Sequence, residues 1–150
     1  MRNHKTIWTL FLLLATASCG ARAQVLKAPD PCDKATSQAD MNDCYGKQYL
    51  AIDARLNRIY HSAMGYLQHD LDAGKSDAAQ EKYLRAAVED LKAAEVAWIK
   101  YRNLHCEAAS QQYEGGTMAS MIHSMCLSMT TEHRIAEIKQ AYENGDRKLE

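Results

Sequence analysis

The chain has 150 residues, of which 47% are hydrophobic and 25% are charged, with seven glycines and two prolines. This length suits one domain rather than two. The composition is that of a soluble globular protein, which excludes disordered, collagen-like and multi-span membrane classes.

Residues 1–23 have the features of a secretory signal peptide. A positively charged start precedes an almost wholly apolar run over 7–15, which is too short to span a bilayer. An A-x-A site lies just before Gln24, so we predict that the mature chain starts there. The alternative is a lipoprotein box ending at a lipidated Cys19, in which Thr16 stands where such boxes usually carry Leu. Both readings predict a periplasmic or secreted protein.

The predicted mature chain is acidic. Residues 1–23 hold three of the 18 basic residues and none of the 19 acidic ones, which leaves 15 against 19 and a net charge of −4. This negative net charge disfavours nucleic acid and anionic lipid as partners. It favours approach to a basic protein, although such a charge also simply keeps a small domain soluble.

Four cysteines follow the signal peptide: Cys32, Cys44, Cys106 and Cys126. An even number in an exported small domain indicates two disulfides, and four cysteines allow three pairings. We predict the local pairs Cys32–Cys44, on either side of a helix start, and Cys106–Cys126, on either side of a glycine turn. No C-x-x-C spacing is present, so we expect no zinc or other metal site and no cofactor.

Helical periodicity begins after a linker at 24–36. Ser37 and Asp40 have the spacing of a capping box, and a turn around Gly74, over 70–76, ends the first helix. Steps of three and four connect its apolar positions. These are Tyr45, Tyr49, Ile52, Leu56, Ile59, Ala63 and Tyr66.

A second helix is predicted from the turn to residue 113. Ser76 is the expected N-cap, and Asp77 suits the positive end of the helix. Glu114-Gly115-Gly116 ends this helix. Its predicted buried stripe is Leu84, Ala87, Leu91, Ala94, Trp98, Tyr101 and His105.

A third helix is predicted from Thr117, as a cap, to Asn144-Gly145, with an irregular stripe and room for a bend over 128–132. Its apolar positions are Met121, Met125, Met129, Ile135, Ile138 and Tyr142. Long helices cannot bury their own stripes, so we predict an all-α, antiparallel three-helix bundle over 37–143 with a tail at 144–150. Two disulfides would brace its thin core.

Several polar side chains share helix faces and predict a structural network that fixes helix register. They are Asp53, Asn57 and Tyr60 on the first helix, Trp98 and Arg102 on the second, and Arg134 on the third. A carboxylate and a guanidinium that face each other across a thin bundle form a bidentate pair. An acid/base site is the functional alternative, but spacing places no second carboxylate or nucleophile nearby.

Methionines at helical spacing give a second alternative, a periplasmic copper protein. Met118, Met121, Met125 and Met129 form a thioether stripe, with His123 and His133 close in sequence, and thioethers suit Cu(I). Methionine at this spacing is more commonly core filler. His61, His69 and His105 lack H-x-x-x-H spacing and are expected at the surface or as capping residues.

Enzyme motifs are absent from the sequence. It contains no G-x-S-x-G, H-E-x-x-H or P-loop pattern, and no serine is accompanied by a His/Asp pattern. We therefore predict that the protein is not an enzyme.

The ordered motifs resemble the LprI-type lysozyme-inhibitor domain over about residues 32–142. The first half carries Cys32, then Ser37-x-x-Asp40-Met41-Asn42-x-Cys44, then Asp53-x-x-Leu56-Asn57-x-x-Tyr60. The second carries Ala97-Trp98-Ile99-x-Tyr101-Arg102-x-x-x-Cys106, Gly115-Gly116-Thr117, and Cys126 followed by Thr131, Arg134 and Ile138. The resemblance implies an exported, all-helical bacterial domain and, from the members that gave the family its name, lysozyme as a protein partner.

The leading hypothesis is therefore an envelope protein that occludes the substrate cleft of a lysozyme. Its candidate contact is the segment 111–116, in which Tyr113 and Glu114 precede Gly115 and Gly116 between two cysteines. A plain interhelical loop is the other reading of this segment. A structural or interaction protein of the envelope, without inhibitory activity, is the third functional class.

Overall fold

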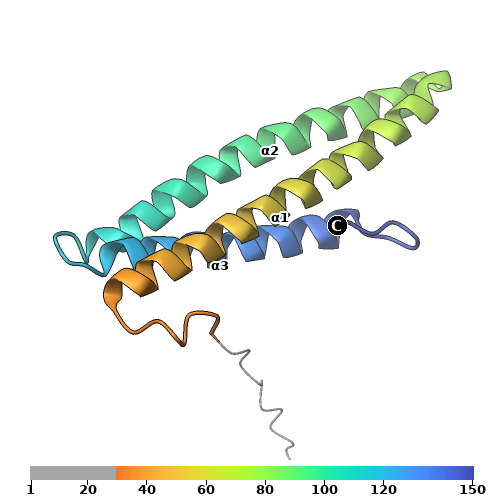
Figure 1. Cartoon of the computed structure of the whole chain (residues 1–150). Coiled ribbons are helices and arrows are strands. Elements are labelled where there is room, and N and C mark those ends of the chain that lie inside the picture. Colours follow the sequence, from red (N-terminus) through yellow and green to blue (C-terminus); the bar gives the residue numbers. More distant parts are fainter. Residues whose placement is uncertain (1–29) are drawn as a thin grey trace, which may run out of the picture.

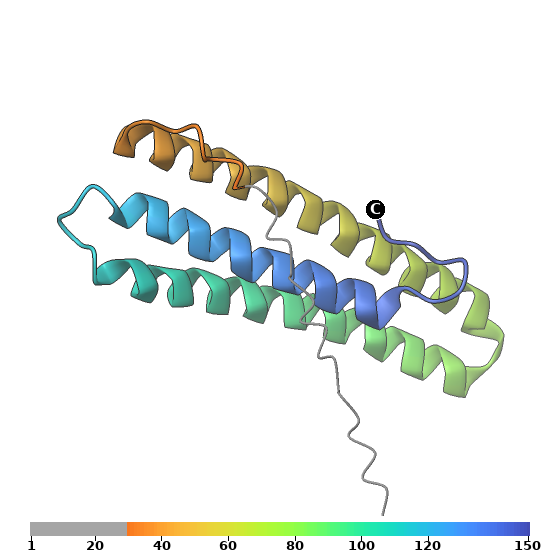
Figure 2. The ribbon, with the colours of Figure 1, turned by 90° about the horizontal axis from the view of Figure 1, so that it is seen from below.

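Residues 30–150 are described by a computed structural model, and they form three α-helices joined by short connections (Figure 1). α1 (Gln38–Ala73) and α2 (Ala78–Gln111) make a long antiparallel hairpin, and α3 (Ala119–Tyr142) runs back along it. Seen from below, α3 lies between α1 and α2 (Figure 2). Within the described range no β-strand occurs, so the predicted all-α, antiparallel three-helix bundle is confirmed. The predicted signal peptide, its cleavage site and Cys19 lie outside this range.

The first helix follows its sequence pattern closely. Ser37 Oγ accepts a hydrogen bond from the Asp40 amide at 3.1 Å, and the Asp40 carboxylate accepts one from the Ser37 amide at 3.2 Å, so the capping box is confirmed. The Ser37 side chain also lowers the pKa of Asp40 by hydrogen bonding to its carboxylate. Four of the predicted positions are buried, namely Ile52, Leu56, Ile59 and Ala63, whereas the predicted tyrosines at 45, 49 and 66 are half-buried. Leu67 and Leu71 are also buried, beyond the predicted stripe.

The hairpin connection is shorter than predicted. α1 continues to Ala73, and a single 3₁₀ turn, η1 (Gly74–Ser76), leads into α2. Asp77 rather than Ser76 is the N-cap, and its carboxylate accepts a hydrogen bond from the Ala79 amide at 2.9 Å. The physical reason is position, because Asp77 directly precedes the first helical residue and its side chain reaches the free amides of the first turn.

The buried face of α2 differs from the predicted stripe. Ala94, Tyr101 and His105 are exposed, so that part of the prediction is wrong. The positions one residue further along are buried instead, and they are Glu95, Arg102 and Cys106. A stripe traced through apolar residues missed this face because two of its members are charged.

The N-cap of α3 lies one residue later than predicted. Met118 occupies the N-cap position without a side-chain cap, so the prediction of Thr117 is wrong. The helix continues uninterrupted through 128–132. Met129 is 63% exposed, contrary to its place in the predicted stripe. The buried positions are Leu127, Ser128, Thr131, Ile135 and Ile138.

Both predicted disulfides are confirmed. Cys32–Cys44 joins the N-terminal segment to α1 across a Cα–Cα distance of 5.8 Å, and Cys106–Cys126 joins α2 to α3 across 5.4 Å. Each bridge closes a short loop, and the local pairing is the one formed among the three that the sequence allowed.

The C-terminal segment, 143–150, folds back onto the bundle (Figure 2). Leu149 is completely buried and belongs to the hydrophobic core. Arg147 donates two hydrogen bonds to Asp70, at 2.8 and 2.5 Å, from its two terminal nitrogens. These bonds hold the pKa of Asp70 below its usual range. The last residues therefore close the core near the hairpin end of α1.

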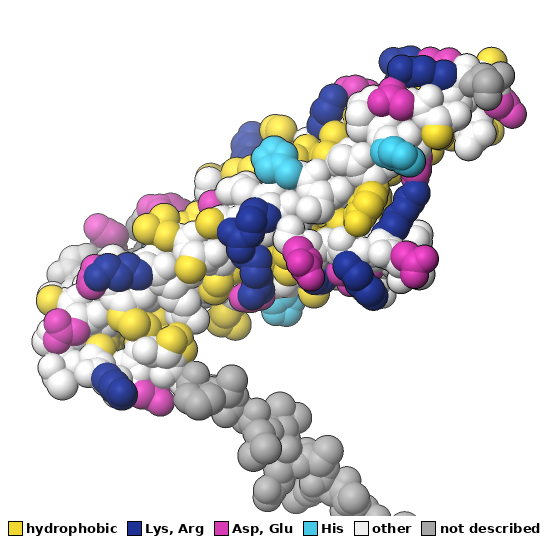
Figure 3. All heavy atoms as spheres, turned by 45° about the vertical axis from the view of Figure 1, so that its right-hand side comes forward, with side chains coloured by type: hydrophobic (Ala, Val, Ile, Leu, Met, Phe, Trp, Pro, Cys, Tyr) yellow, Lys and Arg dark blue, Asp and Glu magenta, His cyan; other side chains and the backbone are white. Residues whose placement is uncertain are grey.

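Charged side chains of both signs lie side by side at the hairpin end of α1 and α2 (Figure 3). The ion pairs there are local, such as Lys75 with Asp72 at 2.7 Å and Arg85 with Glu81 at 2.5 Å. In the part of the chain that the structure describes, no helix is long and apolar enough to cross a membrane.

Candidate functional site

The α2–α3 loop, Gln112–Met118, forms one end of the bundle and is exposed throughout. Three turn hydrogen bonds order it: the Tyr113 amide donates to the Ser110 carbonyl at 2.9 Å, Glu114 to Gln111 at 3.0 Å, and Gly116 to Tyr113 at 3.0 Å. The Tyr113 ring and the Glu114 carboxylate thus project from backbone that is already folded.

Glycine is required where the loop reverses. Gly115 has φ +79°, a left-handed conformation that residues with a Cβ rarely adopt. A Cβ on Gly116 would lie 3.2 Å from the Tyr113 carbonyl oxygen, which is a tight contact with backbone. The Gly-Gly pair therefore fixes the shape of the turn that presents Tyr113 and Glu114.

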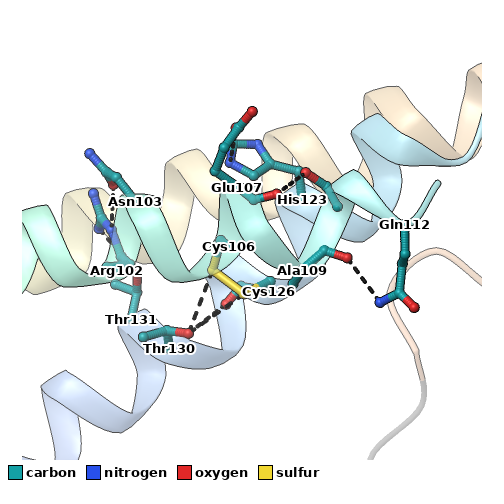
Figure 4. Close-up of a disulfide and its surroundings, with 11 residues drawn as sticks. Arg102, Asn103, Cys106, Glu107, Ala109, Gln112, His123, Cys126, Thr130 and Thr131 are labelled. Carbon is teal, nitrogen blue, oxygen red and sulfur yellow. Dashed lines mark hydrogen bonds and ion pairs between the residues drawn. A yellow bond between two sulfur atoms is a disulfide. The ribbon is translucent and has the colours of Figure 1, made fainter. Parts of the chain in front are cut away.

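The second disulfide joins α2 to α3 behind this loop, six residues before its first residue and eight after its last (Figure 4). Cys106 is completely buried, and the Thr130 hydroxyl lies 3.8 Å from its sulfur while donating to the Cys126 carbonyl at 2.8 Å. On the loop side, Gln112 Nε2 donates to the Ala109 carbonyl at 3.1 Å. The bridge thus fixes the two helices from which the loop extends, and the Gln112 side chain caps the end of α2.

The loop is also attached to α1. Asn42 Nδ2 donates a hydrogen bond to the Thr117 carbonyl at 3.1 Å, and Gln38 Nε2 lies 3.6 Å from the Met121 sulfur. Next to these residues the first disulfide holds the N-terminal segment against α1, where the Tyr45 hydroxyl donates to Asp30 at 2.5 Å. The three chain segments at this end of the bundle are therefore linked to one another.

Behind the loop, Arg102 forms the centre of a polar cluster between the helices. Its guanidinium is buried and donates to Asp53 Oδ1 at 2.6 Å and to Thr131 Oγ1 at 3.2 Å. The Cζ atom lies 5.0 Å from the centre of the Trp98 ring and 5.5 Å from that of Tyr49. One side chain of α2 thus contacts polar partners on both α1 and α3.

Arg134 of α3 approaches Trp98 as well. Its Cζ atom lies 5.8 Å from the centre of that ring, and its Nε donates to Glu95 Oε2 at 3.0 Å. Tyr60 lies close to Glu95, and burial together with this negative charge raises the pKa of its hydroxyl. Asn57 of the same predicted set is exposed.

Glu95 was missed by sequence reasoning, although a signal for it exists. It occupies the register defined by Leu91 and Trp98, so a carboxylate in that register implies a buried partner. Because Asp53 and Glu95 are both paired with guanidinium groups, the cluster joins helices and offers neither a free base nor a nucleophile. It is a frame of ion pairs and hydrogen bonds that joins the three helices.

The methionines of the predicted thioether stripe differ in exposure. Met118 is 41% exposed and Met129 63%, whereas Met121 and Met125 are half-buried. His123 lies near Glu107 instead, with its Nε2 3.8 Å from the carboxylate (Figure 4). Across residues 30–150 the His, Cys, Asp and Glu side chains form no group of three or more suited to a metal ion.

Comparison with known proteins gives one family and one relative. The family model described as lysozyme inhibitor LprI matches residues 32–138. An uncharacterized protein of Rhizobium meliloti (strain 1021) is 39% identical over 129 residues, which cover 85% of this chain and 90% of the relative. No solved structure matches.

Proposed function

This chain belongs to the LprI family of lysozyme inhibitors, and from that membership we propose that it is an exported protein that binds a lysozyme and occludes its substrate cleft. The name of the family describes an inhibitor rather than an enzyme. Inhibition by occlusion needs a rigid, exposed element that fits a cleft, and no bond has to be made or broken.

The preformed α2–α3 loop is the observation that carries this proposal. Its turn hydrogen bonds, the Cys106–Cys126 bridge and the bond from Asn42 order it before any partner arrives. Pre-ordering lowers the entropic cost of binding, so more of the contact energy appears as affinity. Tyr113 supplies an amphipathic ring, a residue type common at the centres of interfaces.

Glu114 and the overall charge supply the electrostatic part. The predicted mature chain carries net charge −4, which favours encounter with a basic lysozyme. Opposite charges raise the rate of encounter, and a carboxylate beside the aromatic anchor adds a charge-assisted hydrogen bond to a cationic donor.

Export is part of the same proposal. Two disulfides in a chain of this size are typical of oxidising compartments. Lysozymes act on the cell wall, outside the cytoplasm, so inhibitor and enzyme would meet in the envelope or beyond it.

A turbidity assay tests the proposal. Lysis of a suspension of bacterial cell walls by hen egg-white lysozyme should slow when the exported protein is added in molar excess. Tyr113→Ala should weaken inhibition at least about tenfold, the effect of losing an interface hot spot. Tyr83→Ala is the matched control, since Tyr83 is 75% exposed near the start of α2, at the opposite end of the bundle. Unchanged lysis in the presence of excess wild-type protein would contradict the proposal.

A further inference from the structure

A groove runs along the outer junction of α2 and α3. It consists of two hollows, of about 340 and 420 Å³, which share Glu137 in their walls and so adjoin one another. The first hollow is lined by Trp98, Tyr101, Met129, Thr130, His133 and Glu137. The second includes Ala87, Asp90, Ala94, Arg134, Glu137 and Tyr142.

Small side chains explain why the groove is open. Ala87 and Ala94 of α2 face Ala141 of α3 across the second hollow. Methyl groups at these positions cannot fill the space between two helix backbones, which lie 8–10 Å apart in ordinary packing. The groove from Ala87 to Tyr101 extends along about 20 Å of α2.

The wall near Trp98 has the composition of an interface core. Tyr101 is 56% exposed and Met129 is 63% exposed, although both line the hollow beside the half-buried Trp98. The Arg102 and Arg134 guanidinium groups hold the indole in place, and the Tyr101 ring stacks on His105 with centres 5.4 Å apart. Aromatic residues and methionine are enriched in the buried centres of protein interfaces.

The charge of the groove is negative. Asp90 and Glu137 line it, and Glu95 binds Arg134 from behind. The lining itself holds the carboxylates of Asp90 and Glu137 against the one guanidinium of Arg134, which leaves one net negative charge. A cationic surface is therefore the complementary partner.

Interface size requires a second contact beside the loop. Stable protein complexes bury about 800 Å² on each partner and use about 20 residues a side, which is more than Gln112–Met118 can supply. Tyr101 lies ten residues before the end of α2, or about 15 Å along the helix axis, which is a distance that one globular partner can cover.

We propose that the α2–α3 groove is the second docking surface for the lysozyme and accepts a basic part of the surface of that enzyme. The inference rests on the proposed function and extends it. In this arrangement the loop blocks the cleft, while the groove supplies apolar contact area and electrostatic selection of a cationic partner.

Binding of hen egg-white lysozyme to the exported protein, followed by calorimetry, tests the groove. The double variant Tyr101→Ala, Met129→Ala should raise the dissociation constant at least about tenfold, because exposed aromatic and thioether anchors are removed. The matched control is Leu50→Ala with Val96→Ala, since these residues are 65% and 71% exposed and line neither hollow. The control should bind within twofold of wild type.

Charge reversal gives an independent measurement. Asp90→Lys should also weaken binding, and raising the salt concentration should reduce the difference from wild type. Glu89→Lys changes net charge equally outside the groove and should have the smaller effect. If lysozyme is inhibited but the Tyr101/Met129 double variant and Asp90→Lys both bind like wild type, the docking role of the groove is refuted and the proposed function stands. If the wild-type protein neither binds nor inhibits, the proposed function itself is refuted.

Discussion

Leu149 offers a direct test of whether the C-terminal segment belongs to the folded domain. Its side chain is completely buried in the core cluster, only one residue from the end of the chain. Tyr66 donates its hydroxyl hydrogen to the Lys148 carbonyl at 3.0 Å, and the Leu149 amide donates to Glu143 Oε1 at 3.0 Å. The segment therefore makes specific contacts with α1 as well as with the end of α3.

Replacing Leu149 by Ala should cost about 2–3 kcal/mol of unfolding free energy, the low end of the range for buried leucines. The low end applies because a terminal segment can move inward and reduce the cavity. For a domain of about 120 residues this corresponds to a fall in melting temperature of about 10 °C.

Thermal and urea unfolding followed by circular dichroism measure this change. Lys148→Ala is the matched control, because its side chain is exposed in the same segment and its loss should change stability by less than about 0.5 kcal/mol. Equal midpoints for Leu149→Ala and wild type would refute the reasoning, because they would mean that the segment is detached in solution and that the core is closed without it.

Three further predictions concern the frame and the loop. Arg102→Met should lower the unfolding free energy by about 2 kcal/mol in urea titrations, because it leaves Asp53 without its guanidinium partner. Asp53→Asn should cost at least as much, because it leaves the more deeply buried Arg102 guanidinium without its counter-charge. Gly115→Ala should lower the unfolding free energy by about 1 kcal/mol, because it places a Cβ at φ +79°. It should also weaken lysozyme inhibition by displacing the turn. An unchanged inhibition curve would argue against the loop as the contact. Because the pKa of Asp70 is lowered in the fold, its ion pair stabilises the protein above the unfolded-state pKa of about 4 and ceases to do so as the pH falls through the folded-state pKa. The difference in unfolding free energy between wild type and Arg147→Gln should therefore shrink between about pH 5 and pH 2.

The helices and disulfides were predictable because their causes are local. The capping box at Ser37, the three-and-four spacing from Ile52 to Ala63, and the glycine turn at Gly115 each act within a few residues of sequence. The pairing of Cys106 with Cys126 follows from the same turn, which returns one helix beside the other.

The candidate site was predictable only in part. The loop at Tyr113 was identified from glycines between two cysteines, but the register of α2 was misjudged at Ala94 and Tyr101 because a hydrophobic pattern assigns charged residues to the surface. Glu95 and Arg102 are buried because each meets an opposite charge on another helix. Such compensation depends on residues 39 to 49 positions away.

Sequence by itself therefore determined three helices, their caps in part and the turn that carries the candidate contact, since these depend on spacing along one chain segment. It favoured the local disulfide pairing without excluding the other two. The tertiary structure alone decided that Leu149 closes the core, that Arg102 and Arg134 meet across Trp98, and that alanines on facing helices leave an acidic groove. The physical reason is that burial and charge pairing are properties of surfaces brought together by folding, and local patterns do not specify which surfaces will meet.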